Sequence, residues 1–232
     1  MSGVFIAGAS GYTGRALIPA WSAAGQRVVA HIREGSAQRT SMETHCRAHN
    51  AEMHVCAWTM AAMEEALAEH SPRFVFACLG TTKKRASKEN ESYESVDYGL
   101  TRLLMDACEG MAEPPRFVYL SAVGAERPTR NAYMAARHRV ESELAATRLR
   151  WTVVRPSFIT GPDRAESRPM ERAGAAAVDG LLGALSLVGG RGVRDRYASL
   201  SGEALAAAMV RLALADEAAG KNAAHAGAAL RG

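Results

Sequence analysis

Short apolar runs alternate with amphipathic segments along the first two thirds of the chain. The apolar runs typical of buried strands lie at 4–7, 28–32, 53–58, 74–79, 117–120 and 151–154. The segments between them that we expect to be helical lie at 12–24, 36–50, 60–70, 93–108 and 131–147. Strands that alternate with helices in this way form a parallel sheet covered on both faces, with right-handed crossovers. The pattern therefore predicts an α/β protein built on a doubly wound parallel sheet.

The pattern changes after Pro156, where glycine and alanine become more frequent and arginines cluster. Two further helices are expected here, at 173–188 and 203–215. The last stretch, 220–232, is rich in alanine and glycine, and we expect it to fray. The segment 157–202 is too short for an independent domain. We predict a single domain over 1–232, with a core of 1–156 and a small substrate-side extension of 157–232.

A glycine-rich turn joins the first predicted strand to the first predicted helix. Its glycines, Gly8, Gly11 and Gly14, have the spacing G-x-x-G-x-x-G. In this context glycines permit a tight turn, close approach of a pyrophosphate and close packing of the helix on the strand. The free N–H groups at the helix N-terminus also attract phosphates. We therefore predict a Rossmann-type dinucleotide site, the alternative being a structural turn without a nucleotide. The cofactor-binding residues expected in this turn are Gly8, Ser10, Gly11, Tyr12, Thr13, Gly14 and Arg15.

The end of the second predicted strand bears on the choice between NAD and NADP. An acidic residue there would bind a ribose 2′-hydroxyl, whereas an arginine would bind a 2′-phosphate. Arg33 closes this strand and Glu34 follows it, so spacing leaves both open. Arg15, Ser36 and Arg39 add to an anion-binding neighbourhood, and guanidinium groups suit phosphate. We predict NADP as the cofactor with Arg33 as a ligand, and NAD as the less favoured alternative.

Three polar residues form a candidate catalytic set. Ser121 ends the fifth predicted strand, Tyr133 lies near the start of the next helix, and Arg137 follows one turn later on the same face. The phenol would donate a proton while hydride reaches a carbonyl carbon, and the cation would stabilise the phenolate. The serine hydroxyl would hydrogen-bond the developing oxyanion. This set predicts carbonyl reduction or the reverse alcohol oxidation.

With these residues in place, the chain resembles the short-chain dehydrogenase/reductase superfamily, and within it the atypical Tat-interacting-protein-type oxidoreductases. The resemblance extends over about residues 3 to 215. The stretches that carry it are Gly8-Ala-Ser-Gly-Tyr-Thr-Gly-Arg15, Cys78-Leu-Gly-Thr-Thr82, Tyr133-Met-Ala-Ala-Arg-His-Arg-Val-Glu141, Arg155-Pro156 and Asp163-Arg-Ala-Glu-Ser-Arg-Pro169. The glycine turn is widespread, whereas the second and last stretches are more specific.

The resemblance implies further cofactor contacts. Residues Leu79, Gly80 and Thr81 would lie along the cofactor, and Pro156, Ser157 and Phe158 would approach its nicotinamide. One departure is that Arg137 stands where the family pattern Tyr-x-x-x-Lys has lysine. Arginine keeps the charge, but its planar fork does not copy an ammonium group. A second departure is Trp58, near the place of an adenine-binding aspartate; it would line the adenine pocket or fill the core.

Composition narrows the class of protein without changing the fold. Hydrophobic residues make up 48% of the chain and charged residues 22%, which excludes a disordered chain. The net charge of +4 is mild and does not point to nucleic acid. The cluster Lys83-Lys84-Arg85 is either a solvated loop or a basic patch that attracts an acidic substrate or helps to hold the pyrophosphate. The histidines show no metal-ligand spacing, since His45 and His49 lack a third ligand nearby, so we expect no metal site.

The cysteines and the chain ends bear on location. Cys46, Cys56, Cys78 and Cys108 form no C-x-x-C pair and are expected to be buried thiols in a reducing compartment. The chain enters its first strand with no secretory pattern before it, and no run of 18 apolar residues is present. We therefore expect a cytoplasmic protein that does not span a membrane.

The resulting hypothesis is an NADP(H)-dependent oxidoreductase acting on a small carbonyl or alcohol. The alternative, suggested by the arginine at position 137, is a non-catalytic NADP(H)-binding redox sensor or regulatory protein. An epimerase is a third and weaker option, because the C-terminal part is short for a nucleotide-sugar pocket. The helices at 93–108 and 131–147 are candidates for pairing in a homodimer. Fold alone does not choose among these functions.

Overall fold

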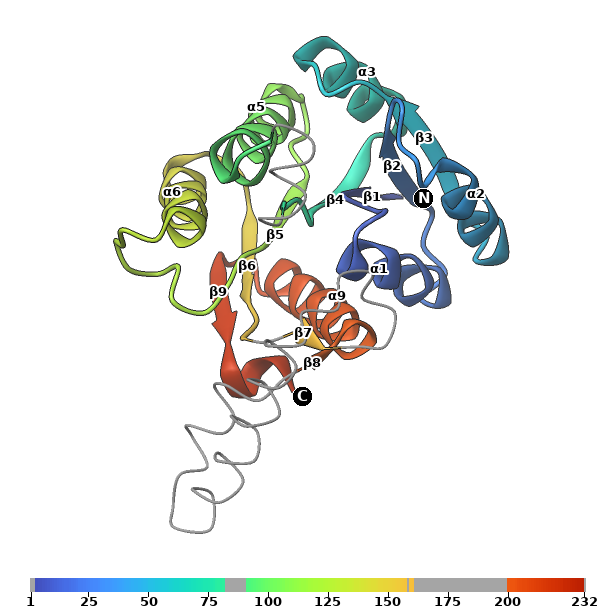
Figure 1. Cartoon of the computed structure of the whole chain (residues 1–232). Coiled ribbons are helices and arrows are strands. Elements are labelled where there is room, and N and C mark those ends of the chain that lie inside the picture. Colours follow the sequence, from blue (N-terminus) through green and yellow to red (C-terminus); the bar gives the residue numbers. More distant parts are fainter. Residues whose placement is uncertain (1–2, 82–90, 158, 161–199, 232) are drawn as a thin grey trace.

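A seven-stranded, wholly parallel sheet forms the centre of the computed structural model, which describes residues 3–81, 91–157, 159–160 and 200–231 (Figure 1). The strand order is β3-β2-β1-β4-β5-β6-β9, so the order reverses direction between β1 and β4. The strands are β1 (Gly3–Ala7), β2 (Val28–Arg33), β3 (Glu52–Cys56), β4 (Pro72–Ala77), β5 (Arg116–Leu120), β6 (Trp151–Arg155) and β9 (Ala223–Ala226). This is the doubly wound Rossmann topology, and the predicted fold class is confirmed.

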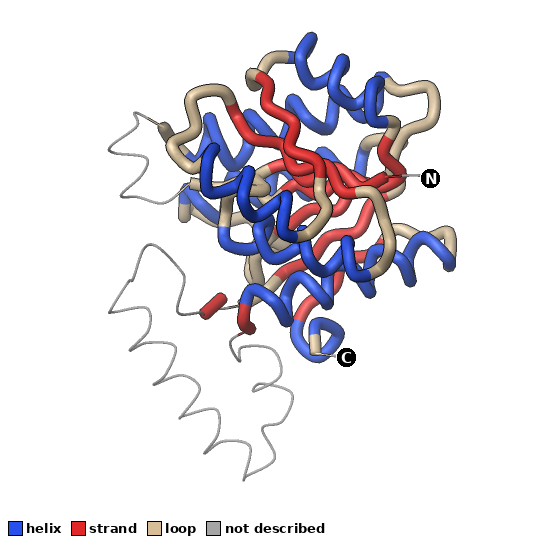
Figure 2. The backbone as a smooth tube through the Cα atoms, turned by 90° about the vertical axis from the view of Figure 1, so that its right-hand side faces the viewer, coloured by secondary structure: helices blue, strands red, loops and turns tan. Residues whose placement is uncertain are grey.

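Helices cover both faces of the sheet (Figures 1 and 2). The helices are α1 (Tyr12–Ala23), α2 (Arg39–Ala48), α3 (Met60–His70), α5 (Thr101–Gly110), α6 (Ala132–Ala146) and α9 (Gly202–Ala218), together with the π-helix η1 (Tyr93–Leu100) and the short 3-10 helix η2 (Gly227–Leu230). A small second sheet pairs β7 (Ile159–Thr160) with β8 (Leu200–Ser201). The expected helix at 173–188 lies outside the described residues.

The two faces of the sheet bury two separate cores. Along β1, Val4 and Ile6 point to the core beneath α1, α2 and α9, whereas Phe5 and Ala7 point to the core beneath α3, α5 and α6. This alternation is the two-residue period of a strand buried on both sides. A strand buried on both faces appears in the sequence as a continuous apolar run, which is why the strands were predictable.

The expected continuous helix over 93–108 is divided in the structure. A π-helix spans Tyr93–Leu100 and an α-helix follows over Thr101–Gly110. The wider turn rotates the inward face, so that the carboxylate of Asp97 is fully buried while Val96 and Leu100 are only half-buried. Single π turns of this kind often occur at functional sites. The prediction of one continuous helix over this segment was therefore partly wrong.

The C-terminal stretch also differs from expectation. Residues 223–226 do not fray but pair in parallel with β6 as the seventh strand. Helix α9 packs against α1 on one face of the sheet. Residues from both ends of the chain therefore build the same layers, and the predicted division at 156 does not separate the core from an extension.

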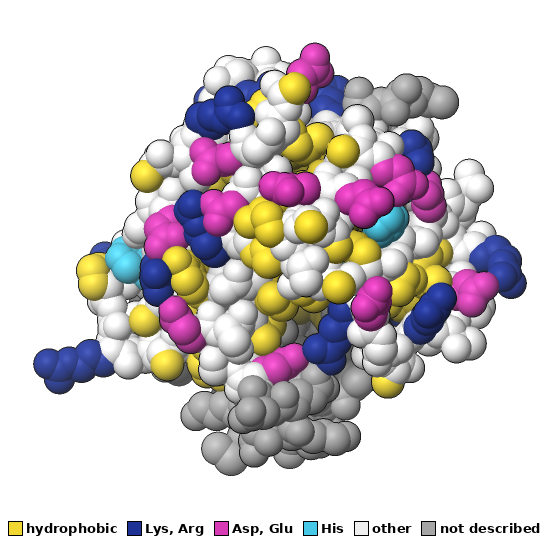
Figure 3. Space-filling model, turned by 90° about the horizontal axis from the view of Figure 1, so that it is seen from above, with side chains coloured by type: hydrophobic (Ala, Val, Ile, Leu, Met, Phe, Trp, Pro, Cys, Tyr) yellow, Lys and Arg dark blue, Asp and Glu magenta, His cyan; other side chains and the backbone are white. Residues whose placement is uncertain are grey.

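Charge is evenly mixed on the face seen from the side of α3 and α5. Acidic and basic side chains are interspersed there, with apolar side chains between them (Figure 3). Among the helices of the described residues, none is both long enough and apolar enough to cross a membrane.

Candidate active site at the carboxyl edge of the sheet

The predicted site residues gather where the parallel strands end. The glycine turn follows β1, residues 78–81 follow β4, Ser121 follows β5, and Pro156 follows β6. In open α/β sheets ligands bind outside the carboxyl ends of the strands, where the strand order reverses. Here that reversal lies between β1 and β4, directly at the glycine turn. The topology thus brings the predicted nucleotide and catalytic segments to one edge.

The glycine turn is shaped for close approach. Gly8 has a φ of +79°, and a Cβ there would lie 2.5 Å from the carbonyl oxygen of Cys78 on the neighbouring turn. A Cβ on Gly14 would lie 2.2 Å from the carbonyl oxygen of Gly8. Both positions therefore require glycine, the first for its conformation and both for space. The turn packs against β4 and against the start of α1.

The N-terminus of α1, with the first backbone N–H groups of the helix, lies at this turn. Gly11 occupies the N-cap, and within the described residues no side chain caps the helix and no acidic residue lies in its first turn. An uncapped helix start with glycines before it is suited to a pyrophosphate, which supplies the missing acceptors and the opposite charge. The residues present therefore fit a dinucleotide.

Tyr12 links the turn to the C-terminal part of the chain. The backbone N–H of Gly202 donates to the Tyr12 hydroxyl at 3.3 Å. A Cβ on Gly202 would lie 2.6 Å from the ring of Tyr12, so the ring packs closely against the start of α9. The turn and α9 are thus fixed relative to each other.

A carboxylate joins the ends of β2 and β4. Arg33 donates from Nη1 to Glu91 at 3.0 Å, and the Thr81 hydroxyl donates to the other oxygen of Glu91 at 3.1 Å. Glu91 thereby occupies the guanidinium that was predicted to bind a 2′-phosphate. Arg15 was also predicted to bind the cofactor, but its side chain donates to Ser41 on α2 at 3.0 Å.

Arg137 is the centre of the predicted catalytic segment, and it is buried. Its guanidinium donates to the carbonyl oxygen of Leu120, to Asp97 at 3.1 Å and, at 3.5 Å, to the carbonyl oxygen of Leu79. Its Cζ lies 4.7 Å from the centroid of the Tyr133 ring. Its Nε is buried and has no hydrogen-bond partner among the described residues. Arg137 therefore joins the turns after β4 and β5 to α6, directly beneath Tyr133.

The electrostatics of this group follow from burial and pairing. Burial opposes the charge of Arg137, but its interactions with Tyr133, Tyr119 and Asp97 outweigh that cost and raise its pKa. Burial raises the pKa of Asp97, while the nearby Arg137 and the N–H of Thr81 act in the opposite direction. Arg137 is therefore a permanent cation beside the half-buried Tyr133.

Ser121 is held by an acidic residue that the sequence analysis did not select. Its hydroxyl donates to Glu141, and Glu141 in turn makes a two-pronged ion pair with Arg155 at 2.6–3.1 Å. Glu141 lies one turn beyond Arg137 on α6. The Ser121 proton is thus directed toward Glu141 in this structure.

Three functional candidates were missed in the sequence: Asp97, Glu91 and Glu141. Glu141 had a signal, because Tyr133, Arg137 and Glu141 repeat every four residues along one helix face. Asp97 had no such signal in the sequence, since its burial depends on the π-helix. Trp58 packs against the core beneath α3 and meets His31 edge-on at 4.7 Å, in agreement with the core alternative. Phe158 lies outside the described residues.

The fold and the glycine turn together define a Rossmann-type NAD(P)-binding protein. Residues 8–180 match the protein family described as NAD(P)H-binding, and the chain belongs to that family. The predicted resemblance to the atypical short-chain dehydrogenases/reductases is confirmed.

A curated relative and solved structures agree with this assignment. The chain is 29% identical over 174 residues to Protein HTATIP2 from Rattus norvegicus, which covers 72% of this chain and 66% of that protein. The chain thus spans just under two thirds of that relative's length. UDP-glucose 4-epimerase from Brucella ovis, solved in complex with NAD, superposes with a TM-score of 0.70 at 17% identity, over 97% of this chain and 76% of the epimerase. NADPH-dependent 3-quinuclidinone reductase from Rhodotorula rubra gives 0.59 at 15% identity, over 91% and 84%. These structures share the fold.

Proposed function

We propose that this protein is an NADP(H)-dependent oxidoreductase that interconverts a small carbonyl compound and its alcohol. The observation that carries the proposal is the half-buried Tyr133, stacked 4.7 Å from the buried guanidinium of Arg137 at the carboxyl edge of the sheet. A phenol beside a fixed cation is the arrangement needed to transfer a proton to or from a substrate oxygen.

Each residue of the site has a distinct task in this proposal. The cofactor, when bound, would supply or accept the hydride. The Tyr133 hydroxyl would donate a proton to the substrate oxygen, and Arg137 would stabilise the phenolate that remains. The Ser121 hydroxyl would turn from Glu141 to the substrate oxygen and hydrogen-bond its developing charge. Asp97 would hold Arg137 in place through their contact at 3.1 Å.

Replacing Tyr133 by phenylalanine tests the proposal directly. We expect Tyr133→Phe to lower NADPH turnover on a panel of aldehydes, ketones and quinones by about 10²- to 10⁴-fold, because the proton donor is lost. NADPH affinity should stay within a few-fold of wild type, since the ring remains. Tyr98→Phe is the matched control, because its hydroxyl bonds Glu143 at 3.1 Å and not the site. Equal turnover in Tyr133→Phe and wild type would refute the proposal.

The preference for NADP over NAD rests on Arg33. A 2′-phosphate would replace the Glu91 carboxylate on this guanidinium, exchanging one anion for another. We expect fluorescence titration to show tighter binding of NADPH than of NADH. In Arg33→Gln the ratio of the two dissociation constants should fall about tenfold. Glu91→Gln should strengthen NADPH binding, since a competing anion is gone. Tighter binding of NADH by the wild-type protein would exclude the preference but leave the oxidoreductase proposal intact.

We further propose a small-molecule substrate and a cytoplasmic location. All four cysteines are free in the structure. Burial raises the pKa of the Cys78 thiol to about 12 and that of Cys56 to about 11. Thiols that stay protonated and unpaired are in keeping with a reducing compartment.

A further inference from the structure

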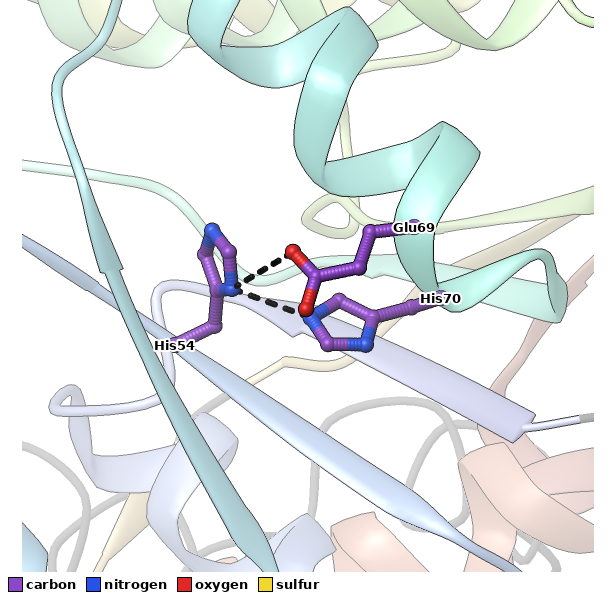
Figure 4. Close-up of side chains that lie close together, drawn as sticks. All are labelled: His54, Glu69 and His70. Atoms are coloured by element: carbon purple, nitrogen blue, oxygen red, sulfur yellow. Dashed lines mark hydrogen bonds and ion pairs between the residues drawn. The ribbon is translucent and has the colours of Figure 1, made fainter.

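Two histidines and a glutamate meet where a strand lies beside the end of a helix (Figure 4). His54 lies in the middle of β3, an edge strand of the described sheet, while Glu69 and His70 form the end of α3. One ligand atom from each, two ring nitrogens and a carboxylate oxygen, lies within 4.8 Å of the others. Because α3 ends next to the start of β4, this group lies toward the amino ends of the strands, away from the candidate active site.

We propose that His54, Glu69 and His70 form a binding site for a divalent transition-metal ion, with Zn²⁺ as the ion of best-matched chemistry. Imidazole nitrogen and carboxylate oxygen are the ligands that Zn²⁺ shares with related ions, and three protein ligands leave one position for water. The site would join the edge strand β3 to α3. It is independent of the proposed oxidoreductase activity.

The distances are close to those of a tetrahedral site. Ligand atoms about 2.05 Å from Zn²⁺ in a tetrahedron are about 3.3 Å from one another. His54 Nδ1 lies 2.9 Å from His70 Nε2 and 3.9 Å from a Glu69 oxygen, so the observed separations bracket that value. Glu69 is more than half exposed, and its side chain is free to close the longer distance. The third separation, between His70 Nε2 and the Glu69 oxygen, is at most 4.8 Å, so a movement of the Glu69 carboxylate toward both rings would complete the set.

The present hydrogen bonds determine where the ring protons lie. Arg27 donates to His70 Nδ1 at 3.2 Å and, being only a donor, requires a lone pair there. His70 therefore carries its proton on Nε2 and donates it to His54 Nδ1 at 2.9 Å. The lone pair of His54 Nδ1 thus points toward His70 Nε2, the atom with which it would share the metal ion.

Metal binding would move one proton within the His70 ring. With the ion on Nε2, the proton would sit on Nδ1 and donate to Glu52, whose nearest oxygen is now 3.9 Å away. A carboxylate behind a metal-bound histidine is the usual outer partner of such sites. Arg27 would turn away from the ring while keeping its ion pair with Glu52, as its half-exposed side chain permits. The proton count of the site does not change.

The pairing of Arg27 with His70 gives the proposal an unusual signature. Arg27 competes with the metal ion, both by its charge and by holding the wrong ring tautomer. Arg27→Gln should therefore tighten metal binding, whereas loss of a ligand should weaken it. A surface that binds ions nonspecifically would not respond in these two directions.

The test is titration of the untagged, metal-stripped full chain with Zn²⁺ by calorimetry and with Co²⁺ by visible absorption. We expect one ion per chain with a dissociation constant on the order of 1 μM. The affinity should fall at least about tenfold in His54→Gln and measurably in the exposed Glu69→Gln, and rise in Arg27→Gln. The Co²⁺ spectrum should be that of nitrogen and oxygen ligands, without a thiolate band.

His49→Gln is the matched control. His49 and His45 also lie close, with ring centroids 4.7 Å apart, but no carboxylate completes a set of three there among the described residues. Unchanged binding in His49→Gln supports the proposal. A dissociation constant weaker than about 100 μM, or equal affinity in wild type and His54→Gln, would overturn it. Wild-type folding of Glu69→Gln and Arg27→Gln is expected because both side chains are exposed.

Discussion

Two buried arginines, Arg116 and Arg137, differ in how completely their guanidinium groups are hydrogen-bonded. Arg116 begins β5 and is fully buried, and each of its three guanidinium nitrogens donates: to Glu217 at 2.7 Å, to the carbonyl oxygens of Trp151 and Lys221 at 2.9 Å, and to that of Asp216 at 3.2 Å. Arg137, by contrast, has a buried Nε without a partner in the described part of the chain, and it lies beside a half-buried tyrosine. Full satisfaction is typical of a structural arginine, whereas an unused donor beside a half-buried phenol is what the proposed role of Arg137 requires.

The carboxylates paired with these two arginines differ in the same sense. Burial acts against the charge of Glu217, but hydrogen bonding from Arg116 and the nearby Arg150 and Arg73 outweigh it and lower the pKa. For Asp97 burial prevails and the pKa is raised, even though Arg137 lies at 3.1 Å. One pair is arranged for stability. The other carries an electrostatic cost that a structural role alone would not require.

The largest expected effect comes from removing the structural arginine. Arg116→Met would leave the surrounding carbonyl oxygens without their donor and Glu217 with only its half-exposed partners Arg73 and Arg150. It should lower the free energy of unfolding by about 3–5 kcal/mol in urea denaturation. Turnover per folded molecule should not change. Arg150→Gln, which removes a half-exposed partner of the same Glu217, should cost less than about 1 kcal/mol. If Arg116→Met lowered the free energy of unfolding by as little as Arg150→Gln, the structural role assigned to Arg116, and with it the contrast with Arg137, would be wrong.

The next effect concerns turnover at the functional arginine. Arg137→Met should reduce kcat about 100-fold, close to 2.7 kcal/mol of activation free energy, because Tyr133 loses its cation. Arg137→Lys should retain at least about a tenth of wild-type kcat, since the charge remains although the planar fork is lost. The double variant Arg137→Met/Asp97→Asn removes the unpaired buried carboxylate and separates misfolding from loss of catalysis. Full activity in this double variant would assign Arg137 a purely structural role.

The smallest effect is the dependence of stability on pH. Glu217, with its pKa lowered below 4.5, contributes stability that is present above that pH and is lost as the pH falls through its folded pKa. Asp97, with its pKa raised above 3.8, acts in the opposite sense, so its contribution to stability falls as the pH rises from 3.8 through its folded pKa. Urea denaturation between pH 3.5 and 7 should show a shallower acid-side loss in Glu217→Gln and a steeper rise with pH in Asp97→Asn. Identical profiles for the two variants would remove the contrast between the pairs.

The sheet and its nucleotide turn were accessible from sequence for a simple reason. Strands buried on both faces are continuous apolar runs, such as those containing Phe76 and Val118, and glycines with required spacing mark the turn. The seventh strand could not be predicted from the sequence, because Ala223–Ala226 is too weakly hydrophobic to indicate a strand. It joins the sheet through pairing with β6 and through the nearby Arg116 network. These supporting residues lie 71 positions away in β6 and 105 positions away at Arg116.

The amino-acid sequence alone determined the Rossmann class, the place of the glycine turn, and Tyr133 and Arg137 on one helix face, because each depends on local spacing and residue type. Only the tertiary structure decided which groups hold the predicted residues. It placed Glu91 on Arg33, Asp97 on Arg137 and Glu141 on Ser121, and it brought His54 to His70. These partners lie 16 to 58 residues apart in the chain. Their contacts depend on how strands and helices pack, and a local pattern of residues does not predict contacts between residues so far apart in the sequence.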